Sequence, residues 1–202
     1  MFLEPHFKGQ RSGWIEVICG SMFSGKTEEL LRRLRRAQYA YQKILVIKPA
    51  KDTRYDTLNL VSHDSNHMPS LTVEKARDIL VLSEGHSVIG IDEAQFFDNE
   101  LISIVQELAF KGVRVIIAGL DMDYLGKPFG PMPGLLAVAE YITKVHAICV
   151  HCGNLATHSY RLSTESDLIL LGAKDIYEPR CRVCYHEGAM FDFHSQETSI
   201  EG

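Results

Sequence analysis

The segment Gly20-Ser-Met-Phe-Ser-Gly-Lys-Thr27 decides the fold of this 202-residue chain. It matches the pattern G-x-x-x-x-G-K-[ST], and it lies between an apolar run, Trp14 to Cys19, and a helical pattern, Thr27 to Gln38. A strand, a glycine-containing loop and a helix form a phosphate-binding P-loop, because the loop's backbone N–H groups and the helix N-terminus attract anions. A chance Gly-Lys-Thr turn is the weaker alternative, because both motif and position are correct.

Further apolar strands alternate with helical patterns along the chain. We expect strands at 44–48, 88–92 and 113–119 with a short last one at 145–149, helices at 72–82, 101–110 and 135–141, and a loop over 50–70. The strands carry apolar residues on both faces, which is typical of a parallel sheet covered by helices on both sides. The chain is therefore predicted to have an α/β fold of the P-loop NTPase type over residues 14–144.

The P-loop predicts a binding site for ATP and Mg²⁺. Lys26 would reach the β- and γ-phosphates, and the Thr27 hydroxyl would bind Mg²⁺. Asp92 ends an apolar strand, where P-loop folds place a second magnesium contact. The remaining nucleotide-binding residues would be those of the loop itself: Gly20, Ser21, Met22, Phe23, Ser24 and Gly25.

Glu93 follows Asp92 and is predicted to face the same crevice. A carboxylate there can accept a proton from a hydroxyl or orient a water molecule. The spacing leaves open whether Glu93 activates water, as in an ATPase, or an alcohol, as in a kinase. A solvated acidic pair at the start of the next helix is the structural alternative.

Arginines at two places could contact phosphates. Arg54 follows the second strand and could swing onto the transferring phosphoryl group, although an ion pair with Asp52 or Asp56 fits the sequence equally well. A second group lies one to two turns beyond the phosphates, on what we predict to be a solvated or subunit-facing side of the first helix: Arg32, Arg33, Arg35 and Arg36.

Four of the five cysteines predict a metal site. They form two C-x₂-C pairs separated by 28 residues: Cys149 with Cys152, and Cys181 with Cys184. Two such pairs make a closed, structural Zn²⁺ site, with iron as the second choice of metal. The ion would order a small lobe at 145–194. Three nearby histidines are expected to be bystanders and the fifth cysteine a buried apolar residue: His151, His158, His186 and Cys19.

Composition restricts the function further. The net charge is −5, and 23% of the residues are charged, which argues against broad capture of nucleic acid. No secretory signal and no run of roughly 18 apolar residues is present, so we expect a soluble, cytoplasmic protein without a membrane partner. Residues 1–13 and 195–202 are predicted to be flexible termini.

In combination, these motifs resemble the type II, zinc-containing thymidine kinases. The resemblance runs from Trp14 to Tyr185. It is carried by the P-loop, the two cysteine pairs and five shorter stretches: KPAKDTRYD (48–56), Ser62-His-Asp64, Ile91-Asp-Glu-Ala-Gln-Phe96, Gly119-Leu-Asp121 and Lys127-Pro-Phe-Gly130.

The resemblance implies ATP-dependent phosphorylation of thymidine on its 5′-hydroxyl to give dTMP, in nucleoside salvage for DNA synthesis. It also implies a homotetramer, feedback inhibition by dTTP, Glu93 as the base, and a lasso-like loop between the cysteine pairs that covers the thymine. Arg54 and Asp52 match the family's phosphate-side loop. The implied thymidine contacts are Met22, Phe96, Leu120, Tyr124, Phe129, Leu168, Leu170 and Tyr177, with Ser159 or Thr157 as the hydroxyl near the base.

Two other functions remain open on the residues alone. A nucleic-acid-stimulated ATPase would hydrolyse ATP faster with DNA and ignore thymidine. A non-catalytic, nucleotide-dependent interaction module would bind ATP without turnover.

Overall fold

A parallel sheet forms the centre of the protein. The computed structural model describes residues 13–50, 59–61, 67–163 and 176–188. Its main sheet has the strand order β5-β2-β6-β7-β1-β8, and all its paired strands are parallel. The strands are β1 (Trp14–Cys19), β2 (Ile44–Pro49), β5 (Leu71–Val73), β6 (Val88–Ile91), β7 (Arg114–Gly119) and β8 (Tyr141–Lys144).

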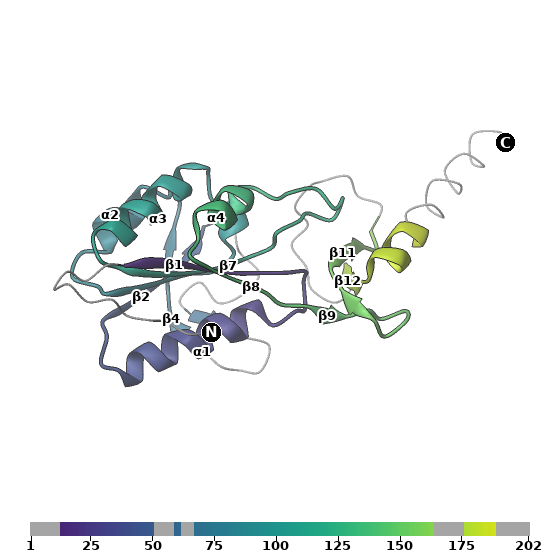
Figure 1. The fold of residues 1–202 in the computed structure, drawn as a ribbon, viewed down its shortest axis with the longest axis horizontal. Coiled ribbons are helices and arrows are strands. Elements are labelled where there is room, and N and C mark those ends of the chain that lie inside the picture. Colours follow the sequence, from purple (N-terminus) through teal and green to yellow (C-terminus); the bar gives the residue numbers. More distant parts are fainter. Residues whose placement is uncertain (1–12, 51–58, 62–66, 164–175, 189–202) are drawn as a thin grey trace.

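Helices cover both faces of this sheet (Figure 1). The helix α1 (Lys26–Tyr39) lies on one face, and α2 (Asp78–Leu82), α3 (Glu100–Phe110) and α4 (Met132–Val138) lie on the other. Successive strand residues point to opposite faces, so Val17 of β1 joins the core under α3 and α4 while Ile18 joins the core under α1. The predicted α/β fold class is confirmed.

The structure corrects the predictions for residues 50–82. The predicted helix at 72–82 begins as strand β5, and only Asp78–Leu82 is helical. Part of the predicted loop at 50–70 is a hairpin of β3 (Asn59–Val61) and β4 (His67–Pro69). These segments are too short for hydrophobic periodicity to distinguish helix from strand, and pairing with neighbouring strands decides their structure.

The end of the main sheet also differs from the prediction. The helix expected at 135–141 is α4, three residues earlier, and Tyr141–Lys144 forms the sixth strand, which pairs with β1. The strand expected at 145–149 is only β9 (Ala147–Ile148), which belongs to a separate two-stranded sheet. As an edge strand, β8 has the exposed Ile142 and lacks a continuous apolar run, so its sequence gave little signal.

A small cysteine lobe, the described residues 145–163 and 176–188, follows β8. It contains the antiparallel pairs β9–β10 (Leu155–Ala156) and β11 (His158–Arg161)–β12 (Tyr177–Arg180), and a helical segment at 182–188. Figure 1 shows this lobe at one end of the main sheet. Within the described ranges, no helix has both the length and the apolar character needed to cross a bilayer.

Arg33 is buried, contrary to the prediction for the arginines of the first helix. It donates hydrogen bonds to Glu16 Oε2 (2.7 Å), Glu29 Oε1 (2.8 Å) and Thr143 Oγ1 (2.8 Å). Burial opposes the ionisation of Glu16, but hydrogen bonds from Arg114 and other donors hold the pKa of this carboxyl below its usual value. These hydrogen bonds therefore link α1 to β1, β7 and β8.

We expect Arg33→Met to lower the free energy of unfolding by about 3 kcal/mol, because it removes one partner of the buried Glu16 carboxylate. The matched control is Arg32→Met, whose side chain is 58% exposed and which should change stability by less than about 0.5 kcal/mol. Urea unfolding measures the free energy of unfolding of both variants. Equal losses in the two variants would contradict a structural role for the buried charge.

Candidate functional site

The P-loop connects β1 to α1 at the end of the sheet that meets the cysteine lobe. Gly20 and Gly25 have φ angles of +146° and +84°, which side-chain-bearing residues rarely adopt. The carbonyl oxygen of Ser21 accepts hydrogen bonds from Ser24 Oγ (2.7 Å) and Lys26 Nζ (2.7 Å). The Lys26 ammonium group thus lies against the loop, beside the N-terminus of α1, where its positive charge would favour an anion.

The structure brings Thr27 and Asp92 together. Thr27 Oγ1 donates a hydrogen bond to Asp92 Oδ2 (3.1 Å), which joins the start of α1 to the end of β6. Burial and the neighbouring charge of Glu93 raise the pKa of Asp92 to about 7. A hydroxyl and a buried carboxylate are oxygen donors of the kind that Mg²⁺ prefers, so the residues present fit a divalent cation beside the phosphates.

Glu93 has an unusual backbone conformation. Its φ of 51° and ψ of 40° place it in the left-handed region, which is uncommon for a non-glycine residue. The carboxylate accepts a hydrogen bond from Gln95 Nε2 (2.5 Å) at the start of the short helix η1 (Ala94–Phe96). Strained backbone of this kind is concentrated at functional sites, where the surrounding structure holds it in place.

Three of the predicted thymidine contacts lie near the ends of β6 and β7. The rings of Phe96 and Phe129 meet edge to face, with centroids 5.7 Å apart. Leu120 is buried at the end of β7, and its N–H donates to Gln95 Oε1 (2.9 Å). Sequence reasoning did not single out Gln95, although it lies within the Ile91–Phe96 motif.

Arg161 joins two other predicted thymidine contacts. Its guanidinium carbon lies 3.6 Å from the ring centroid of Tyr124, and its Nη2 donates to the Tyr177 hydroxyl (2.6 Å). Tyr124 is in the loop after β7, whereas Tyr177 is in the cysteine lobe, so Arg161 bridges the two parts. The sequence offered little signal for this role, because Arg161 is one of three arginines in the predicted lobe at 145–194, whose acidic residues outnumber its basic ones.

The two candidate hydroxyls near the base have different partners. Ser159 Oγ accepts a hydrogen bond from the N–H of Met22 in the P-loop (3.0 Å), whereas Thr157 Oγ1 lies 2.9 Å from His158 Nδ1. Ser159 therefore fastens the cysteine lobe to the P-loop. Four other predicted site residues, and most of the predicted lasso-like loop, fall outside the described residues: Asp52, Arg54, Leu168 and Leu170.

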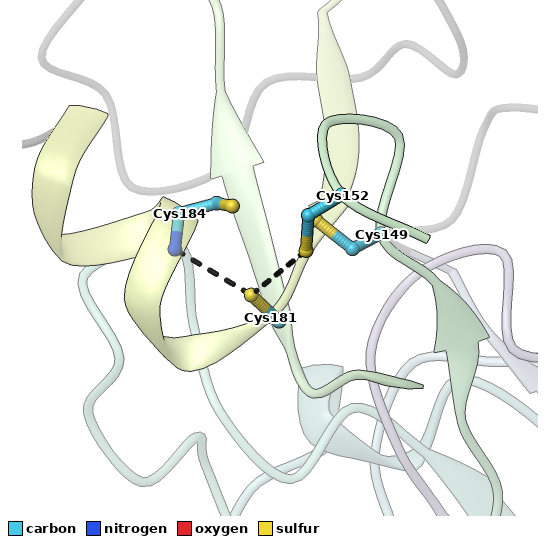
Figure 2. Close-up of side chains that lie close together, drawn as sticks. All are labelled: Cys149, Cys152, Cys181 and Cys184. Atoms are coloured by element: carbon cyan, nitrogen blue, oxygen red, sulfur yellow. Dashed lines mark hydrogen bonds between the residues drawn. The ribbon is translucent and has the colours of Figure 1, made fainter. Parts of the chain in front are cut away.

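The four predicted metal ligands form one cluster (Figure 2). Each offers a Sγ atom, and these atoms lie within 4.8 Å of one another. Zinc bound to four thiolates at about 2.3 Å requires sulfur–sulfur distances of about 3.8 Å, so the cluster is close to the size that the ion needs. The four cysteines could therefore hold a zinc ion: Cys149, Cys152, Cys181 and Cys184.

The charges in this cluster also favour a cation. Burial opposes ionisation of the Cys149 thiol. Backbone N–H groups, including those of Cys181 and Cys152, nevertheless lower the pKa of Cys149 to about 6. Hydrogen bonding to Cys152 and burial raise the pKa of Cys184 to about 12. Adjacent thiolates repel one another, and a bound cation offsets that repulsion.

His151, which was expected to be a bystander, is not one of the four clustered residues. Its Nε2 lies 2.9 Å from Glu178 Oε1.

Comparison with known proteins identifies the family. The family model described as thymidine kinase matches residues 13–185. The chain belongs to the thymidine kinase family. It is 58% identical to a thymidine kinase of Rhodothermus sp. (strain ITI 518), over 88% of this chain and 83% of that protein. It is 56% identical to one of Porphyromonas gingivalis (strain ATCC 33277), over 90% and 89%, and 53% identical to one of Bacteroides fragilis (strain YCH46), over 95% and 97%. The resemblance inferred from the motifs is confirmed.

Ser159→Ala should lower the free energy of unfolding by about 1 kcal/mol, because it leaves the N–H of Met22 without its acceptor. Thr157→Val is the matched control and should change stability less, since its hydroxyl lies against the ring of the adjacent residue, His158. Urea unfolding of the two variants makes the comparison. A larger loss for Thr157→Val would show that Ser159 does not fasten the loop.

Proposed function

We propose that this chain transfers the terminal phosphoryl group of ATP to the 5′-hydroxyl of thymidine, giving ADP and dTMP for nucleoside salvage. Membership of the thymidine kinase family supports this function. The structural observation that carries the mechanism is the Thr27–Asp92 hydrogen bond. It holds the P-loop beside the strand end from which the next residue, Glu93, extends.

In the proposed reaction, the P-loop and the Glu93 carboxylate have different roles. Lys26 and the loop N–H groups stabilise negative charge on the phosphates. The thymidine 5′-oxygen forms a bond to the γ-phosphorus as the bond from that phosphorus to the bridging oxygen of ADP breaks. Glu93 accepts the proton of the alcohol. Mg²⁺, held by Thr27 and Asp92, would offset charge on the phosphates when bound.

Aromatic side chains from both parts of the protein would enclose the nucleoside. We assign this role to Phe96 and Phe129, which contact each other, and to Tyr124 and Tyr177, which Arg161 connects. Apolar walls with a few polar groups are typical of small-molecule sites. The homotetramer, inhibition by dTTP and cytoplasmic location remain predictions from the sequence and the resemblance.

The cysteine cluster is proposed to bind structural zinc. Four protein ligands leave no open coordination position, so the ion would not take part in phosphoryl transfer. Its role would be to hold the loop after β9 against the helical segment that begins at residue 182, and thereby to support the contact between Ser159 and Met22.

Glu93→Gln should reduce the turnover number for thymidine phosphorylation by about 10² or more, because the amide cannot accept the proton. ATP binding should persist, since the P-loop is unchanged. The assay follows transfer of label from ATP to each nucleoside in the presence of Mg²⁺. Normal turnover in this variant would remove Glu93 from the mechanism.

The same assay separates the proposed kinase from the two other functions. ATP hydrolysis that rises with DNA and yields no labelled monophosphate would indicate a nucleic-acid-stimulated ATPase. Binding of ATP without turnover would indicate an interaction module.

Metal analysis of the purified chain should find about one zinc per chain, because four thiolates complete one tetrahedral site. Cys181→Ser should lower the zinc content and the melting temperature. Cys19→Ala is the control, since Cys19 is buried in the main core and should leave the zinc content unchanged. Full retention of activity and melting temperature in zinc-free protein would contradict the structural role.

A further inference from the structure

We propose that Gln95 is a positioning residue that fixes the direction of the Glu93 carboxylate relative to the end of β7. This inference rests on the proposed function, because it assigns Gln95 to the group that acts on the acceptor alcohol.

One buried amide joins the ends of two neighbouring strands. Gln95 is only 2% exposed. Its Nε2 lies 2.5 Å from Glu93 Oε2, and its Oε1 lies 2.9 Å from the backbone nitrogen of Leu120. Since β6 and β7 are adjacent in the sheet, the amide connects the residue that follows β6 by two positions to the residue that follows β7 by one.

The backbone determines the orientation of this amide. A backbone N–H can only donate, so Leu120 requires the amide oxygen on its side. The NH₂ group must then face Glu93. An ionised carboxylate can only accept hydrogen bonds, so this arrangement matches the form of Glu93 that acts as a base.

The missing side chain at Gly119 lets the Gln95 amide approach the backbone closely. A Cβ atom at Gly119 would lie 2.9 Å from Gln95 Oε1 and 2.7 Å from Met132 Sδ, closer than the packing allows. The last residue of β7 thus has no side chain where Gln95 approaches. The amide oxygen therefore lies against the backbone at the end of β7, and this close approach restricts the direction of the hydrogen bond to Glu93.

The two hydrogen bonds of Gln95 separate a structural role from a positioning role. The bond to Leu120 satisfies a buried backbone donor, which folding alone would require. The bond to Glu93 instead restrains a flexible carboxylate. A base already held in its reactive direction loses less freedom when the reaction occurs, and a displacement of about 1 Å can lower a rate by about 10²-fold.

Gln95→Glu and Gln95→Leu test which bond matters for catalysis. Gln95→Glu retains an oxygen that can accept from Leu120 but replaces the donor that faces Glu93 with a second carboxylate. At pH 8 we expect both variants to lower the turnover number by about 10-fold or more, with ATP binding changed by less than about twofold. Wild-type turnover in Gln95→Glu would overturn the inference, because it would show that the contact with Leu120 suffices.

A double-mutant cycle tests whether Gln95 acts through Glu93. In the Glu93→Gln background, Gln95→Leu should lower the residual turnover by less than about twofold, because the carboxylate it positions is already gone. The same fold loss in both backgrounds would overturn the inference while leaving the proposed function intact. Normal turnover of Glu93→Gln alone would instead overturn the proposed base, and this inference with it.

Two further variants control the experiment. Gln106→Leu changes an exposed glutamine of α3, whose amide donates to the carbonyl oxygen of Ile102 in the same helix, and should leave turnover unchanged. If Gln95→Leu does not fold, as judged by its thermal melt, Gln95→Met offers an unbranched side chain of similar length for the same cycle. Equal losses in Gln106→Leu and the Gln95 variants would overturn the inference.

Discussion

Met22 donates its backbone N–H to the Ser159 hydroxyl, and this bond links the P-loop to the cysteine lobe across 137 positions of sequence. On its other side the loop region is tied to the sheet through Thr27 and Asp92. The P-loop and the cysteine lobe are therefore parts of one connected structure. In this arrangement a metal bound by the cysteine lobe would influence the P-loop without contacting it.

Hydrogen bonds of polar side chains connect separate elements in three other places. Glu16, Arg33 and Arg114 connect helix α1 to the sheet, Gln95 connects β6 to β7, and Arg161 connects Tyr124 to Tyr177. Each contact requires particular partners at short distance, whereas apolar packing tolerates small shifts. The core supplies the stability of the fold, and these contacts fix the relative positions of the elements that meet at the site.

Much of this organisation was predictable from local sequence. The P-loop motif, the central strands and the cysteine pairs each carry their signal within a few residues, and the structure has them where they were expected. The edge strands β5 and β8 were missed because pairing with β2 and β1 defines them more than their own composition does. The burial of Arg33 and the contacts of Gln95 and Arg161 depend on residues distant in sequence, so local patterns could not reveal them.

The left-handed backbone at Glu93 lowers the stability of the fold at the position where the proposed chemistry needs a carboxylate. Glycine or asparagine adopts this conformation at a smaller energetic cost than glutamate does. A selection that rewards only resistance to heat would therefore tend to replace the glutamate, and the more stable protein would lack the proposed base. Directed evolution of a thermostable variant should therefore hold this codon constant.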